Sequence, residues 1–269
     1  MTALVGCDLD RTLVYSAAAL MLDGPDEAAP SLVVAEVYEG APLSYLTRAA
    51  EDLLVALAAR ACVVPVTTRT VAQYRRVRLP FSPEWAVTSN GAVILHDGEP
   101  DEQWAGALRA EISASCAPMA DVVELLGVSL PPAAVLRVRD AESLFVYAIV
   151  DRAVLTDGHV AAFAAALAPL GWTVSLQGRK LYAVPVPIRK ERALAAVAER
   201  IGATTTIAAG DSLLDRDMLR WADLGVRPAH GELDAIGWTA PNTVVTERRG
   251  VLAGEELLRT ITAAVERAG

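Results

Sequence analysis

The sequence predicts an α/β protein with a parallel-sheet core that is interrupted by an inserted α+β unit. Near both ends of the chain, short apolar runs alternate with segments of helical periodicity, a pattern typical of a parallel sheet with crossover helices. Polar residues directly follow several of these runs. The middle third instead contains neighbouring strand-like runs joined by turn residues, which indicates antiparallel pairing.

Composition limits the classes of function that the chain can have. The 269 residues are 53% hydrophobic, which fits one large domain or two modest ones. A net charge of -9 argues against non-specific binding to nucleic acid or to anionic membrane surfaces. It is compatible with a small anionic substrate, because a metal ion and a local cation can reverse the field inside a cleft.

Three cysteines, Cys7, Cys62 and Cys116, lie far apart in the sequence and predict free thiols rather than a disulfide framework. We therefore expect a reducing, cytoplasmic location. The opening residues lack the basic region and cleavage site of a signal peptide. No apolar run reaches the ~18 residues of a transmembrane helix, so no membrane span is expected.

The first part of the chain reads as strand, helix, strand. Residues 3–9 form an apolar run that ends in acidic residues, and residues 61–66 form another that ends in Thr67-Thr68-Arg69. Between them, apolar residues recur at helical spacing over residues 43–60. The intervening segment 14–42 is longer than a compact link needs, and it contains residues 32–38 as an extra strand or flap of open role.

The middle of the chain has a different pattern. Residues 85–88 and 92–95 are strand-like and are joined by Ser89-Asn90-Gly91, a turn signal. A stretch rich in alanine and leucine predicts one long helix over residues 102–126. The elements expected next are strands at 134–138 and 144–150, a helix at 158–167, and strands at 172–176 and 180–184.

The α/β pattern returns after Pro185 and Pro187. The elements expected there are helices at 189–201, 213–221 and 254–268 and strands at 205–209, 224–226 and 243–246. We therefore expect a discontinuous core of residues 1–80 and 187–269, and an inserted domain of residues 81–186. Ligands of open parallel sheets bind outside the carboxyl ends of the strands, so the polar residues at those ends are the candidates for function.

Those strand ends carry the groups that phosphoryl transfer needs. Asp8 and Asp10 follow the first strand, and Gly210-Asp211-Ser212 follows a later one, with Asp215 a few residues on. A carboxylate can act as nucleophile and divide hydrolysis into two easier steps. Carboxylates and a carbonyl are also hard oxygen ligands of the kind that Mg²⁺ prefers, while a lysine and a hydroxyl can hold phosphate oxygens.

Four segments, in order, resemble the motifs of the haloacid dehalogenase (HAD) superfamily. They are Asp8-Leu9-Asp10-Arg11-Thr12, Thr67-Thr68-Arg69, Lys190 with Ala193-Leu194, and Gly210 to Leu219. The insertion lies where that family places its C2 caps, and Ser89-Asn90-Gly91-Ala92 is similar to the turn that opens such caps. The chain thus resembles the Cof-type branch, which includes sucrose-phosphate phosphatases.

The resemblance implies a Rossmann-like core with a C2-type cap that closes over the site. It implies that Asp8 is the nucleophile and Asp10 the general acid and base. Asp8, the backbone carbonyl of Asp10, and Asp211 would hold Mg²⁺, with Asp215 supporting the metal shell. The groups implied to bind phosphate or substrate are Thr67, Thr68, Arg69, Asn90 and Lys190.

The expected function is a Mg²⁺-dependent phosphatase acting on a small phosphorylated metabolite, with sugar phosphates as candidates. Two alternatives stay open: a phosphomutase of the phosphomannomutase type, and a non-catalytic regulatory module on the same fold. Structural explanations also stay open for single residues. Asp215 could be a solvated helix residue, Arg69 could face the surface, and Asn90 could serve only the turn. For Lys190, the rival phosphate-binding lysine is Lys180, in a strand of the insertion.

Overall fold

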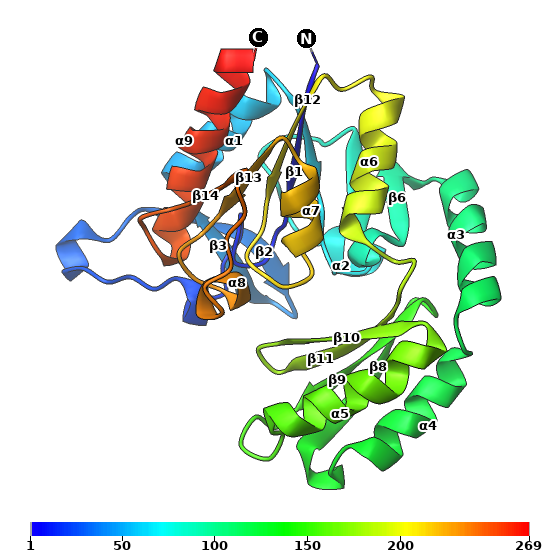
Figure 1. Ribbon diagram of the computed structural model, residues 1–269. Coiled ribbons are helices and arrows are strands. Elements are labelled where there is room, and N and C mark those ends of the chain that lie inside the picture. Colours follow the sequence, from blue (N-terminus) through cyan, green and yellow to red (C-terminus); the bar gives the residue numbers. More distant parts are fainter. Residues whose placement is uncertain (1, 269) are drawn as a thin grey trace. The chain divides into compact units, whose positions relative to one another are not determined.

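The computed structural model describes residues 2–268, which divide into two compact units. Unit 1 comprises Met1–Asp101 and Lys190–Gly269, and unit 2 comprises Glu102–Arg189. The chain therefore leaves unit 1, builds unit 2 and returns to unit 1 (Figure 1). This is the organisation expected of a core with one inserted domain, and it confirms the predicted fold class.

Unit 1 is built on a five-stranded sheet with the order β14-β13-β12-β1-β4, in which all neighbouring strands are parallel. The strands are β1 (Ala3–Cys7), β4 (Cys62–Pro65), β12 (Thr205–Ala209), β13 (Leu224–Arg227) and β14 (Thr243–Val245). β1 has all five residues buried, as expected of a central strand covered on both faces. The carboxyl ends of all five strands meet at one edge of the sheet.

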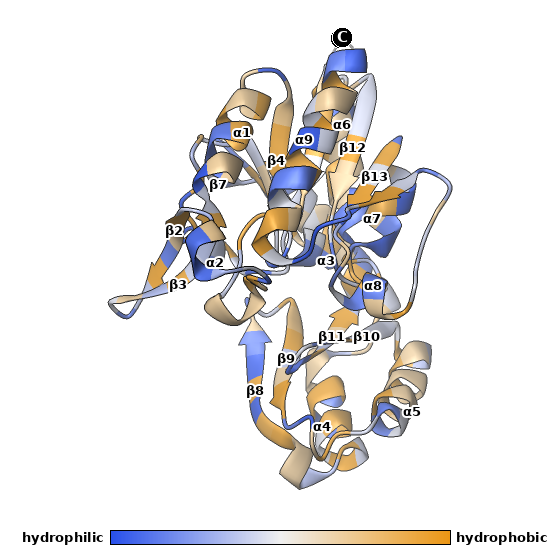
Figure 2. Cartoon of the chain, turned by 90° about the vertical axis from the view of Figure 1, so that its left-hand side faces the viewer, coloured by the Kyte–Doolittle hydropathy of each residue, from blue (hydrophilic) through white to orange (hydrophobic). Residues whose placement is uncertain are grey.

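Helices cover both faces of this sheet. On one face lie α1 (Arg48–Ala58) and α9 (Gly250–Ala268), and on the other lie α6 (Lys190–Arg200) and α7 (Arg216–Trp221) (Figure 1). Helix α9 carries both apolar and polar segments (Figure 2), and its apolar side enters the core through Leu257, Leu258 and Ile261. This amphipathic pattern holds the helix against the sheet. The remaining short helices of unit 1 are α2 (Val71–Tyr74), α8 (Glu232–Ala235), η1 (Ala17–Ala19), η2 (Asp26–Ala28) and η3 (Ser89–Gly91).

A small antiparallel sheet of β5 (Trp85–Thr88), β6 (Val93–His96) and β7 (Glu99–Pro100) also belongs to unit 1. The predicted inserted domain began at residue 81, whereas the structure begins unit 2 at Glu102. The reason is that β5 continues the core next to β4. Val66 and Val87 form a parallel bridge, and the backbone N–H of Thr67 donates to the carbonyl of Val87 at 2.8 Å.

The segment of open role contains a hairpin formed by β2 (Leu32–Tyr38) and β3 (Ala41–Thr47). The extra strand expected at residues 32–38 is thus present. The helix expected over residues 43–60 is wrong in its first part, because residues 43–47 pair with β2 as a strand. Helix α1 begins at Arg48, after Thr47, whose hydroxyl accepts from the backbone N–H of Ala50. Thr47 is therefore the N-cap.

Unit 2 contains a four-stranded antiparallel sheet with the order β10-β11-β9-β8, and helices α4 and α5 pack against it and against each other. Its exposed edge strand, β8, carries charged residues such as Arg137 and Arg139, which protect an open edge from pairing with another chain. The elements are β8 (Val135–Ala141), β9 (Phe145–Val150), β10 (Trp172–Gln177), β11 (Lys180–Pro185), α3 (Glu102–Ser115), α4 (Met119–Ser129), α5 (Asp157–Leu167), η4 (Pro132–Ala134) and η5 (Ala168–Leu170).

The single helix expected over residues 102–126 is two helices. α3 ends at Ser115 and α4 begins at Met119, after Pro118, because proline cannot donate to a helical carbonyl and restricts the residue before it. Within residues 2–268, no single helix has the length and apolar composition of a membrane span. The bent pair α3 and α4 meets those two criteria only when it is taken together.

Candidate active site

Three strand ends of unit 1 bring the candidate residues to one edge of the sheet. Asp8 follows β1, Thr67 follows β4 and Asp211 follows β12. Backbone hydrogen bonds extend the sheet to these positions: Asp8 N donates to Ala209 O at 2.9 Å, and Val66 N donates to Cys7 O at 2.7 Å. The site thus forms where the topology of a parallel sheet predicts it.

The loop after Asp8 is a tight turn. The carbonyl of Leu9 accepts from the backbone N–H groups of Thr12, Leu13 and Val14 at 2.8–3.2 Å. Arg11 takes a left-handed conformation with φ 64°, which is uncommon for a residue with a side chain. The turn fixes the direction in which the chain leaves Asp8.

His230 holds this loop from the other side, a role that the sequence did not reveal. Its Nδ1 accepts from the backbone N–H of Gly250 at 3.1 Å, so Nε2 carries the proton and donates to the carbonyl of Arg11 at 2.8 Å. Burial lowers the pKa of His230, which favours this neutral form. Tyr15 adds a hydrogen bond from its hydroxyl to the carbonyl of Thr12 at 2.9 Å.

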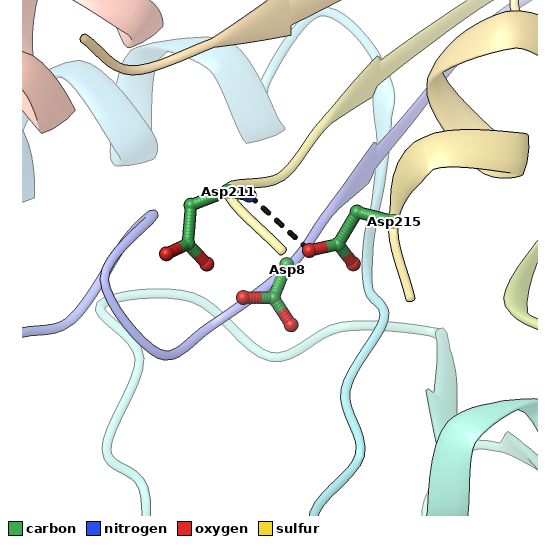
Figure 3. Close-up of side chains that lie close together, drawn as sticks. All are labelled: Asp8, Asp211 and Asp215. Atoms are coloured by element: carbon green, nitrogen blue, oxygen red, sulfur yellow. Dashed lines mark hydrogen bonds between the residues drawn. The ribbon is translucent and has the colours of Figure 1, made fainter. Parts of the chain in front are cut away.

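Asp8, Asp211 and Asp215 form a buried acidic cluster. One carboxylate oxygen from each lies within 4.8 Å of those of the other two, and Figure 3 shows the three side chains together. Gly231 permits this arrangement: it has φ 92°, and a Cβ there would lie 2.4 Å from Oδ2 of Asp211. In the sequence these acids lie at or near the ends of two predicted strands, and the fold brings them together.

Lys190, the first residue of α6, supplies the buried cation of the cluster. Its Nζ donates to Oδ1 of Asp8 at 2.7 Å and to Oδ1 of Asp215 at 2.5 Å. Its side chain is only 1% exposed. The rival lysine, Lys180, lies in β11 of unit 2 and is exposed.

Asp215 is completely buried, and both of its carboxylate oxygens accept hydrogen bonds. Besides Lys190, its Oδ2 accepts from the backbone N–H of Asp211 at 3.2 Å and of Ser212 at 2.9 Å, and from the Ser212 hydroxyl at 2.7 Å. Asp215 is therefore not a solvated helix residue. It connects the loop after β12 to Lys190 and so fixes both.

The cluster is electrostatically strained. Burial raises the pKa of Asp8 to about 7; Lys190 opposes the shift, whereas the charges of Asp215 and Asp10 add to it. Burial and the charge of Asp8 likewise raise the pKa of Asp211 well above its usual value. Burial alone would lower the pKa of Lys190, but the charges of Asp215 and Asp8 outweigh it and raise that pKa.

Asp10 lies at the exposed side of the site, with 51% of its side chain accessible. Both of its carboxylate oxygens accept from Arg69: Oδ2 from Nε and Oδ1 from Nη2, each at 2.8 Å. Arg69 also donates from Nη1 to Oε2 of Glu36 at 2.7 Å. Arg69 is therefore not a surface residue, and Glu36 is a member of the site that the sequence interpretation missed.

Thr67, Thr68 and Asn90 surround the end of β4. Thr67 is completely buried, and its hydroxyl accepts from the backbone N–H of Arg69 at 3.2 Å. Thr68 is half-buried. Asn90 is buried in the turn after β5 with φ 60°, and its backbone N–H donates to the carbonyl of Thr67 at 2.9 Å. Asn90 thus has the predicted turn conformation and touches the strand end that carries Thr67.

The donor set of the acidic cluster fits a divalent cation. Lys190 and the half-exposed Arg11, whose Nε lies 3.6 Å from Oδ2 of Asp211, are its cations. They leave at least one of the three carboxylate charges uncompensated when all three acids are ionised. Three converging carboxylates, two of which (Asp8 and Asp211) have raised pKa values, are suited to a hard ion such as Mg²⁺.

Solved structures show which known proteins share this fold, although the sequence itself matches no protein-family model and no curated protein. The sucrose-phosphatase from Synechocystis has a TM-score of 0.69 and 15% identity, with 98% of each chain covered. A HAD superfamily phosphatase from Bacteroides thetaiotaomicron has a TM-score of 0.56 and 14% identity, with 98% of this chain and 96% of that chain covered.

A sugar phosphatase of HAD subclass IIB is also similar, with a TM-score of 0.55 and 15% identity, and with 98% of this chain and 100% of that chain covered. The likeness extends over both units of the chain, including the insertion between Asp101 and Lys190. The fold of the chain is therefore that of the HAD superfamily phosphatases.

Proposed function

We propose that the chain is a Mg²⁺-dependent phosphatase that hydrolyses a small phosphomonoester through a phospho-aspartate on Asp8. The observation that carries the proposal is the buried cluster in which Lys190 bridges Asp8 and Asp215 while Asp8, Asp211 and Asp215 converge on one point. A nucleophilic carboxylate, a fixed cation and a set of oxygen ligands are what phosphoryl transfer requires. The fold shared with HAD phosphatases supports the same assignment.

In this proposal Asp8 attacks phosphorus, the bond from phosphorus to the leaving oxygen breaks, and Asp10 gives its proton to that oxygen. Asp10 then takes a proton from the water that hydrolyses the phospho-aspartate, which releases phosphate and restores Asp8. Lys190 fixes the Asp8 carboxylate, and Lys190 and Thr67 bind phosphate oxygens. Asp8, the carbonyl of Asp10 and Asp211 would hold Mg²⁺, which supplies positive charge for the phosphate oxygens when bound.

The substrate class follows from charge and from the structural neighbours. The net charge of -9 disfavours nucleic acid as a partner. Solved structures with this fold include phosphatases that act on sugar phosphates, so a sugar phosphate is our leading candidate. The proposal extends to a reducing, cytoplasmic location, which the three unpaired cysteines support.

The direct test is a phosphatase screen on the purified chain. We expect Mg²⁺-dependent release of phosphate from p-nitrophenyl phosphate and from at least one sugar phosphate, and loss of that activity in excess chelator. Phosphate and sugar isomers are quantified separately, because a phosphomutase would convert a hexose 1-phosphate to its isomer. If no phosphate is released from any compound in a broad panel with Mg²⁺, the proposal is wrong.

Mg²⁺ is also expected to stabilise the folded chain, independently of turnover. An ion that binds only the native state adds about 2.7 kcal/mol at a hundredfold excess over its dissociation constant. Addition of MgCl2 to metal-free protein should therefore raise Tm, as measured by scanning fluorimetry. Asp211→Asn removes one ligand and should abolish most of that shift.

A matched control is Asp217→Asn, in the same segment. Asp217 is half-buried and pairs with its neighbour Arg216 at 3.2 Å, outside the acidic cluster. This variant should keep the full Mg²⁺-dependent rise in Tm. An undiminished rise in Asp211→Asn would locate the ion elsewhere.

A further inference from the structure

The β2–β3 hairpin carries a completely buried carboxylate, which is unusual on an edge strand. Glu36 lies in β2, where the flanking residues Val34 and Val37 are exposed, yet Glu36 is 0% exposed. The register of the hairpin shifts on both sides of Glu36. Such a bulge redirects a side chain, and here it turns both Ala35 and Glu36 inward.

Glu36 sits between two arginines. Its Oε2 accepts from Nη1 of Arg69 at 2.7 Å, and its Oε1 accepts from Nε of Arg76 at 3.0 Å. A carboxylate buried this deeply stays charged only when it is paired. Glu36 therefore holds the guanidinium groups of both arginines in place.

Arg69, which is held by Glu36, in turn restricts the orientation of Asp10. Three of its five N–H donors are used by carboxylates: Nη1 by Glu36, and Nε and Nη2 by Asp10. The bidentate contact fixes the plane of the Asp10 carboxylate. Asp10 is half-exposed whereas Glu36 is buried. In the series Glu36–Arg69–Asp10, Glu36 is therefore the residue that fixes the other two.

Both ends of this arrangement are tied to the core of unit 1. The hairpin is bound to the segment after α2, through the backbone N–H of Arg78, which donates to Ala35 O at 2.7 Å, and through a bridge between Glu36 and Val77. Arg69 is held by its backbone N–H, which donates to the Thr67 hydroxyl, and by its carbonyl, which accepts from Ser89 N at 2.7 Å. The contact between Glu36 and Arg69 therefore joins two segments that are each held by backbone hydrogen bonds.

We infer that Glu36 is a positioning residue for proton transfer, acting through Arg69 to orient the carboxyl group of Asp10. The hairpin of residues 32–47 thus has a role in the reaction, although Glu36 itself touches no reacting atom. This inference rests on the proposed function, in which Asp10 protonates the leaving oxygen. It assigns Arg69 to Asp10, and not to the phosphate contact that its motif suggested.

The test compares two substrates that differ by one nitro group, and therefore in how much the leaving oxygen needs a proton. p-Nitrophenolate leaves without protonation, whereas the more basic phenolate of phenyl phosphate leaves more readily with it. General acid catalysis contributes about 10²–10⁴-fold where it is needed. Glu36→Gln keeps the shape of the side chain and removes its charge. We expect it to lower kcat/KM for phenyl phosphate at least about tenfold more than for p-nitrophenyl phosphate, a part of the full general-acid contribution.

Three further variants complete the design. Asp10→Asn should show the same selective loss, and a larger one. Arg69→Lys keeps the charge but loses the bidentate contact with Asp10, and should also lower kcat/KM more for phenyl phosphate than for p-nitrophenyl phosphate. It serves as the second variant if Glu36→Gln fails to fold. Arg76→Lys, at the other partner of Glu36, should leave the ratio of the two substrates near its wild-type value.

The outcomes separate the inference from the function on which it rests. If Glu36→Gln and Arg69→Lys lower kcat/KM equally for both substrates, or not at all, the positioning role is wrong while the phosphatase stands. If the wild-type chain hydrolyses neither substrate with Mg²⁺, the proposed function fails and the inference fails with it. A selective loss on phenyl phosphate in both variants supports the inference.

Discussion

Asp8→Asn is expected to lower kcat for p-nitrophenyl phosphate by at least about a thousandfold, because removal of the proposed nucleophile leaves only the contributions of binding and charge. The amide keeps the size of the side chain but cannot form the phospho-aspartate. Activity is measured as phosphate release with saturating Mg²⁺. Asp217→Asn, outside the cluster, should stay near the wild-type rate.

The same substitution is expected to stabilise the metal-free protein at alkaline pH. The pKa of Asp8 is about 7 in the folded chain and close to 3.8 in the unfolded chain, so the folded state binds the proton more tightly. Stability is therefore lost as pH rises from about 4 to about 7. Asn does not titrate and escapes this loss.

The check is chemical unfolding with chelator at two pH values. The free energy of unfolding of Asp8→Asn should exceed that of the wild type at pH 8, and the difference should shrink toward pH 4. An inactive variant that is more stable than the wild type indicates an active site held under strain. Near-wild-type turnover by Asp8→Asn would rule out Asp8 as the nucleophile.

Three residues of the candidate site could be found from the sequence because they follow apolar strands closely. Asp8, Thr67 and Asp211 each follow such a run, and parallel strands bring their carboxyl ends to one edge. Lys190 was predictable only through its resemblance to a motif. Its reach to Asp8 and Asp215 depends on how α6 packs, which local spacing does not encode.

Other features depend on contacts between distant residues. Residues 43–47 fit a helical spacing, but pairing with β2 makes them a strand, since tertiary contacts override weak local preference. Glu36 belongs to no recognisable motif, and its burial accompanies register shifts in the β2–β3 hairpin that the sequence does not reveal. His230 has no motif, and its role arises because it meets the loop of Arg11 from far along the chain. The break at Pro118 was visible in the sequence, as proline is a local signal.

Among the variants described, Lys190→Met is expected to show the largest decrease in the free energy of unfolding, together with loss of activity. Its Nζ is the buried partner of both Asp8 and Asp215, and removing one partner of a buried ion pair costs about 3–5 kcal/mol. Methionine is about as long as lysine but carries no charge, so the loss of stability reports the missing charge rather than a cavity. In chelator at neutral pH, the free energy of unfolding measured by urea titration should fall by about 3–5 kcal/mol.

The pH dependence identifies the cause of this loss. Without Lys190, the charged form of Asp8 is less favourable, so its pKa in the folded state rises further above the unfolded value. A carboxyl group with a raised folded pKa loses stability as pH increases. The deficit of Lys190→Met should therefore be larger at pH 8 than at pH 5.

Lys180→Met provides the matched control, because Lys180 is exposed in β11 and its Nζ lies 5.8 Å from the ring centre of Tyr147. Surface substitutions of this kind change stability by within about 0.5 kcal/mol. A uniform loss in Lys190→Met at pH 5 and pH 8 would mean that packing, and not the charge of Lys190, holds the cluster together. A loss that grows with pH, with Lys180→Met unaffected, assigns the stabilisation to the ammonium group between Asp8 and Asp215.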